Sequence, residues 1–170
     1  MIYPVVVTQF SKMLGNLASI LDKASAHAQA KNFDIDVLLQ SRLSPDQFNL
    51  MRQIQVACDT AKLAAARLAD KEQDAPTHAD DEKSLAEITA RINSVIAYLG
   101  SLNADDFEAA AQRRITQPRW KGKSLSGDEF LTQHAIPNLY FHITTAYAIL
   151  RHNGIEVGKM DYLGELPFKE

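Results

Sequence analysis

The sequence has little of what stabilises small exported proteins. Among its 170 residues there is one cysteine, Cys58, which cannot form a disulfide bond within the chain. A single thiol is typical of proteins in a reducing compartment, and the first residues lack both the basic segment and the long apolar segment of a signal peptide. We therefore expect a cytoplasmic protein that is stabilised by its hydrophobic core.

An excess of positive charge and a long apolar run are also missing. The formal net charge is −3, so no overall positive field attracts nucleic acid or an acidic membrane surface. The most apolar stretch, residues 139–150, contains a histidine and two threonines and is shorter than the ~20 residues that a membrane-spanning helix needs. We expect no nucleic-acid partner and no insertion into a membrane.

Glycine and proline are scarce, with seven and six residues, whereas hydrophobic residues make up 46% of the chain. This composition and length are typical of one globular domain, which we expect to span residues 1–170. Four segments space their apolar residues by three and four, as amphipathic helices do, at residues 4–28, 45–69, 85–102 and 126–153. Their connections favour an all-α, antiparallel four-helix bundle in up-down-up-down order, with room for one longer crossover.

Local signals place two helix starts and one irregularity. The Ser-Pro-Asp-Gln run at 44–47 predicts that the second helix begins at Pro45, because serine caps, proline fits the first turn and glutamine can bond back. Ser126 and Glu129 form a similar capping box at the start of the fourth helix. Pro137 inside that helix predicts a kink.

Three segments lack a helical pattern. Residues 70–81 form an acidic loop, and residues 113–127 form an irregular or hairpin-like connection before the fourth helix. Residues 155–170 predict an extended tail that lies over the bundle, because their glycines argue against a fifth helix.

The connection before the fourth helix is basic. It surrounds Trp120, has no acidic residue between 113 and 123, and contains five cations: Arg113, Arg114, Arg119, Lys121 and Lys123. A basic loop with an aromatic residue can bind phosphates or single-stranded nucleic acid. The negative charge of the whole chain favours the other interpretation, a solvated loop that balances acidic helices.

Polar residues interrupt the apolar face of the fourth helix. His134, Asn138 and His142 are spaced by four and share a face with apolar residues. A buried imidazole without a partner costs roughly 1–3 kcal/mol, so each ring needs a hydrogen bond, a water molecule or a metal ion. Eight residues of helix separate the two histidines by ~12 Å, too far to bind one ion together. A hydrogen-bonded core histidine is the favoured interpretation of His142, and a ligand contact the alternative.

The same helix carries a resemblance to a known family. Phe-His-Ile-Thr-Thr-Ala-Tyr at 141–147, Ile-Leu-Arg-His-Asn-Gly at 149–154 and Gly-Lys-Met-Asp at 158–161 resemble the signature of an uncharacterised bacterial domain-of-unknown-function family. That family is related to the DinB/YfiT-like metalloenzyme superfamily. Ser-Pro-Asp at 44–46, with Phe48, Leu50 and Gln53, is similar to its second-helix pattern. The resemblance covers nearly the whole chain and implies a DinB-like four-helix bundle.

The resemblance also implies where a metal would bind. DinB-like proteins hold a divalent metal with one histidine on the second helix and two on the fourth. His142 matches the first ligand of the fourth helix, but Ala146 stands one turn later. The second helix has no histidine, and Gln53 and Cys58 are the nearest substitutes. Two of three imidazoles are missing, so the resemblance implies a degenerate metal site.

Two functions follow from this comparison. The first is a small-ligand-binding or stress-related domain without a cofactor, with a polar pocket formed by Gln53, Asn138, His142 and Tyr147. The second is a metal-dependent hydrolase or thiol transferase in which His142 binds Zn or Ni together with nonstandard ligands. Both stay open at this stage.

Two further expectations concern Cys58 and self-association. A cysteine on a helical stripe behaves as a small hydrophobic residue, and a nucleophilic Cys58 would need His142 opposite it. The fourth helix is apolar on more than one side, which predicts a homodimer through the residues outside the histidine face: Leu139, Tyr140, Ile143, Tyr147 and Leu150.

Overall fold

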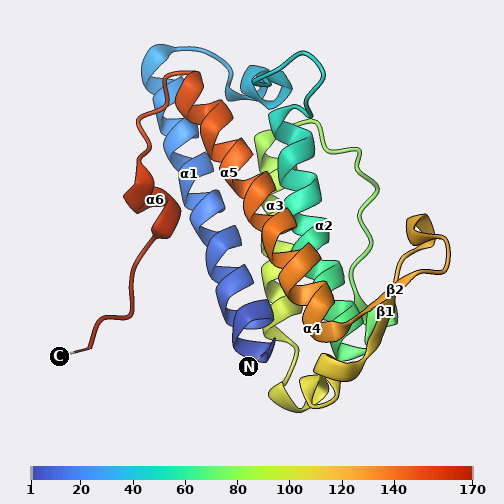
Figure 1. Cartoon of the computed structure of the whole chain (residues 1–170). Coiled ribbons are helices and arrows are strands. Elements are labelled where there is room, and N and C mark those ends of the chain that lie inside the picture. Colours follow the sequence, from blue (N-terminus) through green and yellow to red (C-terminus); the bar gives the residue numbers. More distant parts are fainter. Residues whose placement is uncertain (1, 170) are drawn as a thin grey trace.

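The computed structural model describes residues 2–169, and most of them are helical, as the sequence predicts. Four long helices lie side by side (Figure 1): α1 Phe10–Lys31, α2 Leu50–Ala69, α3 Leu85–Gly100 and α5 Ile136–His152. The short helices are α4 Gly127–Phe130 and α6 Lys159–Leu163, and β1 Arg114–Thr116 pairs with β2 Ser124–Ser126 in an antiparallel hairpin. Tighter 3-10 turns cover Ile35–Gln40, Glu72–Asp74, Ala104–Phe107, Ala110–Gln112 and Pro118–Trp120, and π-helical turns cover Pro4–Gln9 and Leu131–Ala135. Within residues 2–169, every helix is too short or too polar to cross a bilayer.

The helix directions differ from the predicted up-down-up-down order, because α2 and α3 run in parallel. Arg91 in the middle of α3 pairs with Asp59 in the middle of α2 at 2.9 Å. Beyond the ends of the same helices, Lys71 pairs with Asp106 at 2.8 Å. Residue numbers on the two helices therefore rise together. The physical cause is the connection 70–84, which returns along the length of α2 before α3 begins (Figure 1). It is the one longer crossover for which the sequence left room.

The core lies between the four long helices. The predicted stripe of α1 is fully buried, with Phe10, Leu14 and Leu17 among the inaccessible side chains. On α2 the predicted alanines Ala57 and Ala61 are also inaccessible. Small side chains at these positions let another helix approach closely, and α2 packs against α5 along its whole length (Figure 1).

The helix starts confirm one capping prediction and correct another. Ser126 and Glu129 form the predicted box at the start of α4. The second helix, however, begins at Leu50 and not at Pro45. The Ser44 hydroxyl donates to Asp46 at 2.6 Å within a separate turn, and Asn49 caps α2 by accepting the Arg52 N–H at 2.9 Å. An asparagine cap directly before the apolar run therefore replaces the serine cap that the sequence pattern favours.

Pro137 lies in the first turn of α5, where its missing N–H costs least. The preceding residues Leu131–Ala135 widen into a π-helical turn. Such a turn separates the short α4 from α5 and absorbs the interruption of the hydrogen-bond ladder. The predicted fourth helix is therefore three consecutive helical segments.

The tail contains α6, although its glycines predicted no fifth helix. The Gly158 N–H donates to Asp161 at 2.8 Å, which closes the first turn. Lys23 of α1 pairs with the same carboxylate at 2.6 Å, and Asn16 donates to the Tyr162 carbonyl at 2.9 Å. Contacts with α1 therefore stabilise a helix that the local sequence disfavours.

The residues that predicted a homodimer are largely covered within the chain. Leu139, Ile143 and Leu150 are inaccessible to solvent. Tyr147 packs edge-to-face against Tyr162 of α6 with 6.0 Å between ring centroids. The apolar excess of the fourth helix is thus used inside the molecule, and the homodimer stays a prediction.

A buried arginine fixes the long connection. The side chain of Arg91 on α3 is 1% exposed and pairs with Asp80 at 2.6 Å, Glu82 at 3.0 Å and Asp59 at 2.9 Å. Asp80 and Glu82 belong to the connection, whereas Asp59 belongs to α2. One guanidinium therefore joins the connection to two helices.

Replacing Arg91 with methionine leaves these carboxylates without their shared partner. We expect the free energy of unfolding to fall by about 3 kcal/mol, because breaking a buried ion pair leaves uncompensated charge. Arg52→Met is the control, since Arg52 pairs with Asp80 nearer the surface at 2.5 Å and should cost about 1 kcal/mol or less. Chemical denaturation measures both variants, and equal losses would contradict the role of Arg91.

Candidate functional site

His142 on α5 faces Gln53 on α2, and the two side chains are hydrogen-bonded in the interior. His142 Nδ1 lies 2.7 Å from Gln53 Oε1. The Gln53 amide nitrogen donates to the Phe48 carbonyl at 3.1 Å, so the amide oxygen faces the ring and can only accept. Nδ1 therefore carries the proton, and Nε2 carries the free lone pair. The hydrogen bond that the sequence analysis favoured for His142 is therefore present, and it involves the Nδ1 edge of the ring.

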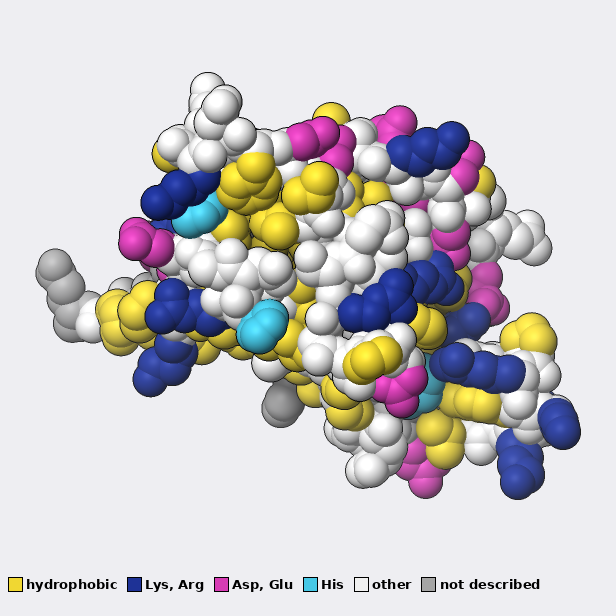
Figure 2. Space-filling model, turned by 90° about the horizontal axis from the view of Figure 1, so that it is seen from above, with side chains coloured by type: hydrophobic (Ala, Val, Ile, Leu, Met, Phe, Trp, Pro, Cys, Tyr) yellow, Lys and Arg dark blue, Asp and Glu magenta, His cyan; other side chains and the backbone are white. Residues whose placement is uncertain are grey.

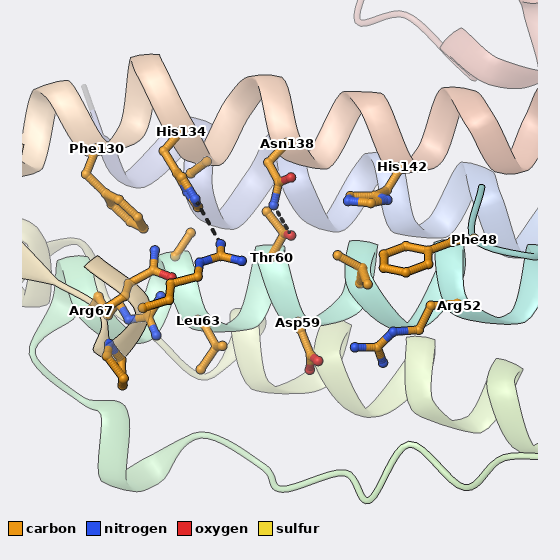
Figure 3. Close-up of a pocket in the computed structure, with 16 residues that line it drawn as sticks. Phe48, Arg52, Asp59, Thr60, Leu63, Arg67, Phe130, His134, Asn138 and His142 are labelled. Atoms are coloured by element: carbon orange, nitrogen blue, oxygen red, sulfur yellow. Dashed lines mark hydrogen bonds between the residues drawn. The ribbon is translucent and has the colours of Figure 1, made fainter. Parts of the chain in front are cut away.

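The other edge of the ring borders a groove of about 480 Å³ between α2 and α5. Gln53 does not line this groove, so the ring meets the groove with the side that faces away from Gln53, where Nε2 lies. Figure 3 shows His134 of the π-helical turn and Asn138 and His142 of α5 projecting in a row toward α2. The groove is lined by Phe48, Arg52, Val56, Asp59, Thr60, Leu63, Ala64, Arg67, Gln117, Pro118, Arg119, Phe130, His134, Ala135, Asn138 and His142.

The ring of His142 is neutral. Burial, followed by the nearby positive charge of Arg52, lowers the pKa of His142 from its ordinary value of 6.5 to about 4. Only 7% of the residue is exposed. At neutral pH the ring therefore presents an uncharged nitrogen that accepts a hydrogen bond.

Positive charge dominates the groove. Three arginines line it, Arg52, Arg67 and Arg119, and Asp59 is the one acidic residue in the lining. Asp59 is already bonded to Arg91 at 2.9 Å and to Lys62 at 2.9 Å, so its charge is compensated from outside the groove. Arg52 and Arg67 are likewise paired, with Asp80 and Glu72 outside the lining. Arg119 is therefore the cation of the lining without a carboxylate partner among residues 2–169, and its charge favours an anion at that end of the groove.

The hairpin β1–β2 supplies one end of the groove. Arg119 Nη2 lies 3.3 Å from His134 Nε2, and Phe130 stacks on the His134 ring with 5.3 Å between centroids. Burial, with the charges of Arg119 and Arg67, lowers the pKa of His134. Figure 2 shows Lys and Arg side chains gathered on this projecting hairpin. The sequence predicted a hairpin-like connection here, but not that it would reach the groove.

Two basic residues of this connection form hydrogen bonds within the protein. Arg113 donates to the Leu68 carbonyl, and Arg114 donates to Ser124 at 3.0 Å and to the Gly122 carbonyl at 3.2 Å. These bonds hold the connection against the end of α2 and close the hairpin upon itself. The expectation that the connection binds no nucleic acid stays a prediction.

The structure brings together three of the four residues of the predicted pocket. Asn138 donates to Thr60 at 2.8 Å across the groove, one turn from His142, and Gln53 holds His142 from behind. Tyr147 does not reach the groove, because its hydroxyl donates to the Val157 carbonyl at 3.4 Å on another side of α5. Sequence reasoning missed Arg52, which directly precedes Gln53, and Phe48, whose carbonyl accepts from the Gln53 amide; a closer look at the residues near Gln53 in the sequence could have suggested both.

Cys58 lies in the core and does not face the groove. It has no exposed surface, and burial raises the pKa of its thiol to about 12. The thiol is therefore protonated at neutral pH, as the structural interpretation of this cysteine requires.

The donor set does not fit the divalent metal of DinB-like proteins. Among residues 2–169, no three His, Cys, Asp or Glu side chains come close enough to hold an ion together. His142 uses Nδ1 for Gln53, and the α2 residues that line the groove next to it are Arg52 and Val56. An amide oxygen and a guanidinium do not replace imidazole ligands.

Comparison with known proteins agrees with the fold. A crystal structure of a DinB family member from Shewanella denitrificans matches with a TM-score of 0.97 and 60% sequence identity, covering 100% of this chain and 96% of that chain. The architecture is thus that of a DinB-like helical protein, as the resemblance implied. The family described as Domain of unknown function (DUF1993) matches residues 2–163, and the chain belongs to that family. The search of curated proteins found no match.

Titration of His142 generates a pH dependence of stability. The unfolded chain binds this proton at the ordinary pKa of 6.5, whereas the folded chain binds it only at about 4. Stability is therefore unaffected above pH 6.5 and falls as the pH drops from 6.5 toward 4, where the unfolded state binds more protons. We expect His142→Phe to show a shallower fall over this window in urea denaturation at a series of pH values. Equal slopes for the two proteins would refute a buried, neutral His142.

We expect the His142 site to bind zinc and nickel only weakly. We expect competition with a colorimetric chelator to give the same weak affinity for the native protein and for His142→Ala, because a single imidazole holds these ions poorly. Metal retained in stoichiometric amount by native protein and lost on His142→Ala would show that nonstandard ligands converge on this ring.

Proposed function

We propose that this protein is a non-enzymatic, single-domain binding protein whose small-molecule ligand occupies the groove between α2 and α5. One observation carries the proposal: His142 is buried and neutral, its Nδ1 is bonded to Gln53 at 2.7 Å, and its Nε2 edge borders the groove. A core histidine with a purely structural role would have no need to present a fixed acceptor to a groove. The row of Asn138 and His134 beside it extends the polar edge along the ligand path.

The arrangement of the helices supports a ligand at this place. Bundles often bind ligands between facing helices, and here the antiparallel pair α2 and α5 borders the groove. In this DinB-like bundle α2 runs parallel to α3, and α1 runs parallel to α5. The apolar part of the groove includes Val56, Leu63 and Phe130. The polar groups of the lining stand beside these apolar side chains, and small-molecule sites combine the two kinds of contact.

The alternative of a metal-dependent hydrolase or thiol transferase receives less support. It requires ligands around His142 that the donor set in residues 2–169 does not supply, and a thiolate that the buried Cys58 does not provide. A stress-related role, a cytoplasmic location and homodimerisation stay predictions from the sequence.

Protein-observed NMR with a mixed fragment library tests the groove. We expect fragments to shift the ring signals of His142, and we expect Val56→Trp to abolish their binding because the indole fills the groove between the helices. Val37→Trp is the matched control, since Val37 is 59% exposed on a 3-10 turn outside the groove.

Fragments that bind Val56→Trp as well as they bind native protein would overturn the proposal. Binding confined to residues outside the groove lining would overturn it too. Amide spectra of both variants establish beforehand that each tryptophan protein is folded.

A further inference from the structure

The hairpin end of the groove holds a buried amide with no partner. Gln117 is 8% exposed, and its Nε2 atom is buried without a hydrogen bond to any of residues 2–169. Gln117 also lines the groove. Leaving a buried donor unpaired costs roughly 1–3 kcal/mol, so a native structure keeps such a group only for a reason.

Two arginines at the same end have N–H groups that can donate further hydrogen bonds. Arg119 meets only the neutral ring of His134, at 3.3 Å, and no carboxylate in the described chain pairs with it. Arg67 uses its Nε to bind Glu72 at 3.0 Å, which leaves its terminal nitrogens for another acceptor. This end of the groove therefore offers an amide N–H and two guanidinium groups, and Glu72, which lies outside the lining, bonds to the Nε of Arg67.

The two ends of the groove differ in chemistry. The hairpin end donates hydrogen bonds and is positive, whereas the far end offers the His142 Nε2 acceptor beside the aromatic ring of Phe48. Eight residues of helix between His134 and His142 separate these ends by ~12 Å. Between the two ends, α2 lines the groove with the apolar side chains Val56, Leu63 and Ala64 and with two polar residues, Asp59 and Thr60, of which Thr60 is bonded to Asn138.

We propose that the ligand is a small organic carboxylate with an apolar body. Its carboxylate lies among Gln117, Arg119 and Arg67, and a hydroxyl or N–H at its other end donates to His142 Nε2. This inference rests on the proposed function of the groove and names the ligand class. A planar carboxylate suits the site because guanidinium and amide N–H groups can each bond one of its two oxygens.

Two matched probes test the carboxylate. The acid 3-(4-hydroxyphenyl)propionate carries a carboxylate and a hydroxyl at opposite ends of an apolar ring, and 3-(4-hydroxyphenyl)propionamide has the same size without the charge. We expect calorimetry to show the acid binding about tenfold or more tighter, since charge-assisted hydrogen bonds are roughly twice as strong as neutral ones. The side-chain amide signal of Gln117 should shift with the acid.

Variants locate the contact. We expect Gln117→Met and Arg119→Gln each to weaken the binding of the acid about tenfold, as the loss of one hydrogen bond to a charged group does. We expect little effect on the binding of the amide. Lys123→Gln removes the same charge from an exposed position of the same hairpin outside the groove lining, and should leave both affinities unchanged.

The outcomes separate this inference from the proposed function. Equal affinity for acid and amide would overturn the carboxylate and leave the groove as a binding site. Tighter binding of phenyl phosphate than of the acid would overturn it in favour of a phosphate ligand. If neither probe binds, this ligand class is wrong, and the fragment experiment alone then decides whether the groove is a binding site.

Discussion

The hydrogen bond between His142 and Gln53 is the constraint on which the account of this molecule depends. It joins the two helices with the most extensive contact in the fold, and it does so with a donor and an acceptor that are both buried. Because Gln53 is itself anchored to the Phe48 carbonyl, the direction of the bond is fixed. One edge of the imidazole thereby bonds to Gln53, and the other edge carries the acceptor lone pair of Nε2.

The same bond bears on whether this DinB-like site could hold a metal. The Nδ1–H donated to Gln53 leaves Nε2 as one ligand atom, but no three His, Cys, Asp or Glu side chains of residues 2–169 come together, and an amide is a poor substitute for an imidazole ligand. The groove between α2 and α5 instead offers a neutral acceptor at one end and cations at the other. Members of a family share a fold, but the residues of the site determine which function each protein can have.

The buried Arg91 links the architecture to the charge of this groove. It holds the long connection 70–84 against the parallel pair α2 and α3, and it compensates Asp59. Together with Lys62 it balances the charge of the one acidic residue in the groove lining, so an anion in the groove meets less negative charge.

Much of the fold could be predicted from the sequence, because apolar spacing and capping residues act locally. The parallel direction of α3 could not, since it depends on the ion pairs that join Arg91 to the connection 70–84 and to Asp59 of α2, and apolar spacing carries no signal of them. Of the pocket, His142 and Asn138 were predictable from their spacing of four, whereas Tyr147, five residues on, lies about 140° around the helix and misses the groove. Gln117 and Arg119 carry no periodic signal, and only the packing of the hairpin against α2 and α5 brings them to the site.

The tautomer of His142 tests the central claim most directly. Long-range ¹⁵N–¹H correlation spectra of labelled protein at pH 7 distinguish the two neutral forms of the ring. The account predicts a proton on Nδ1, a bare Nε2, and a ring that stays neutral until the pH approaches 4. A ring protonated on Nε2, or one that is charged at pH 6, would contradict it.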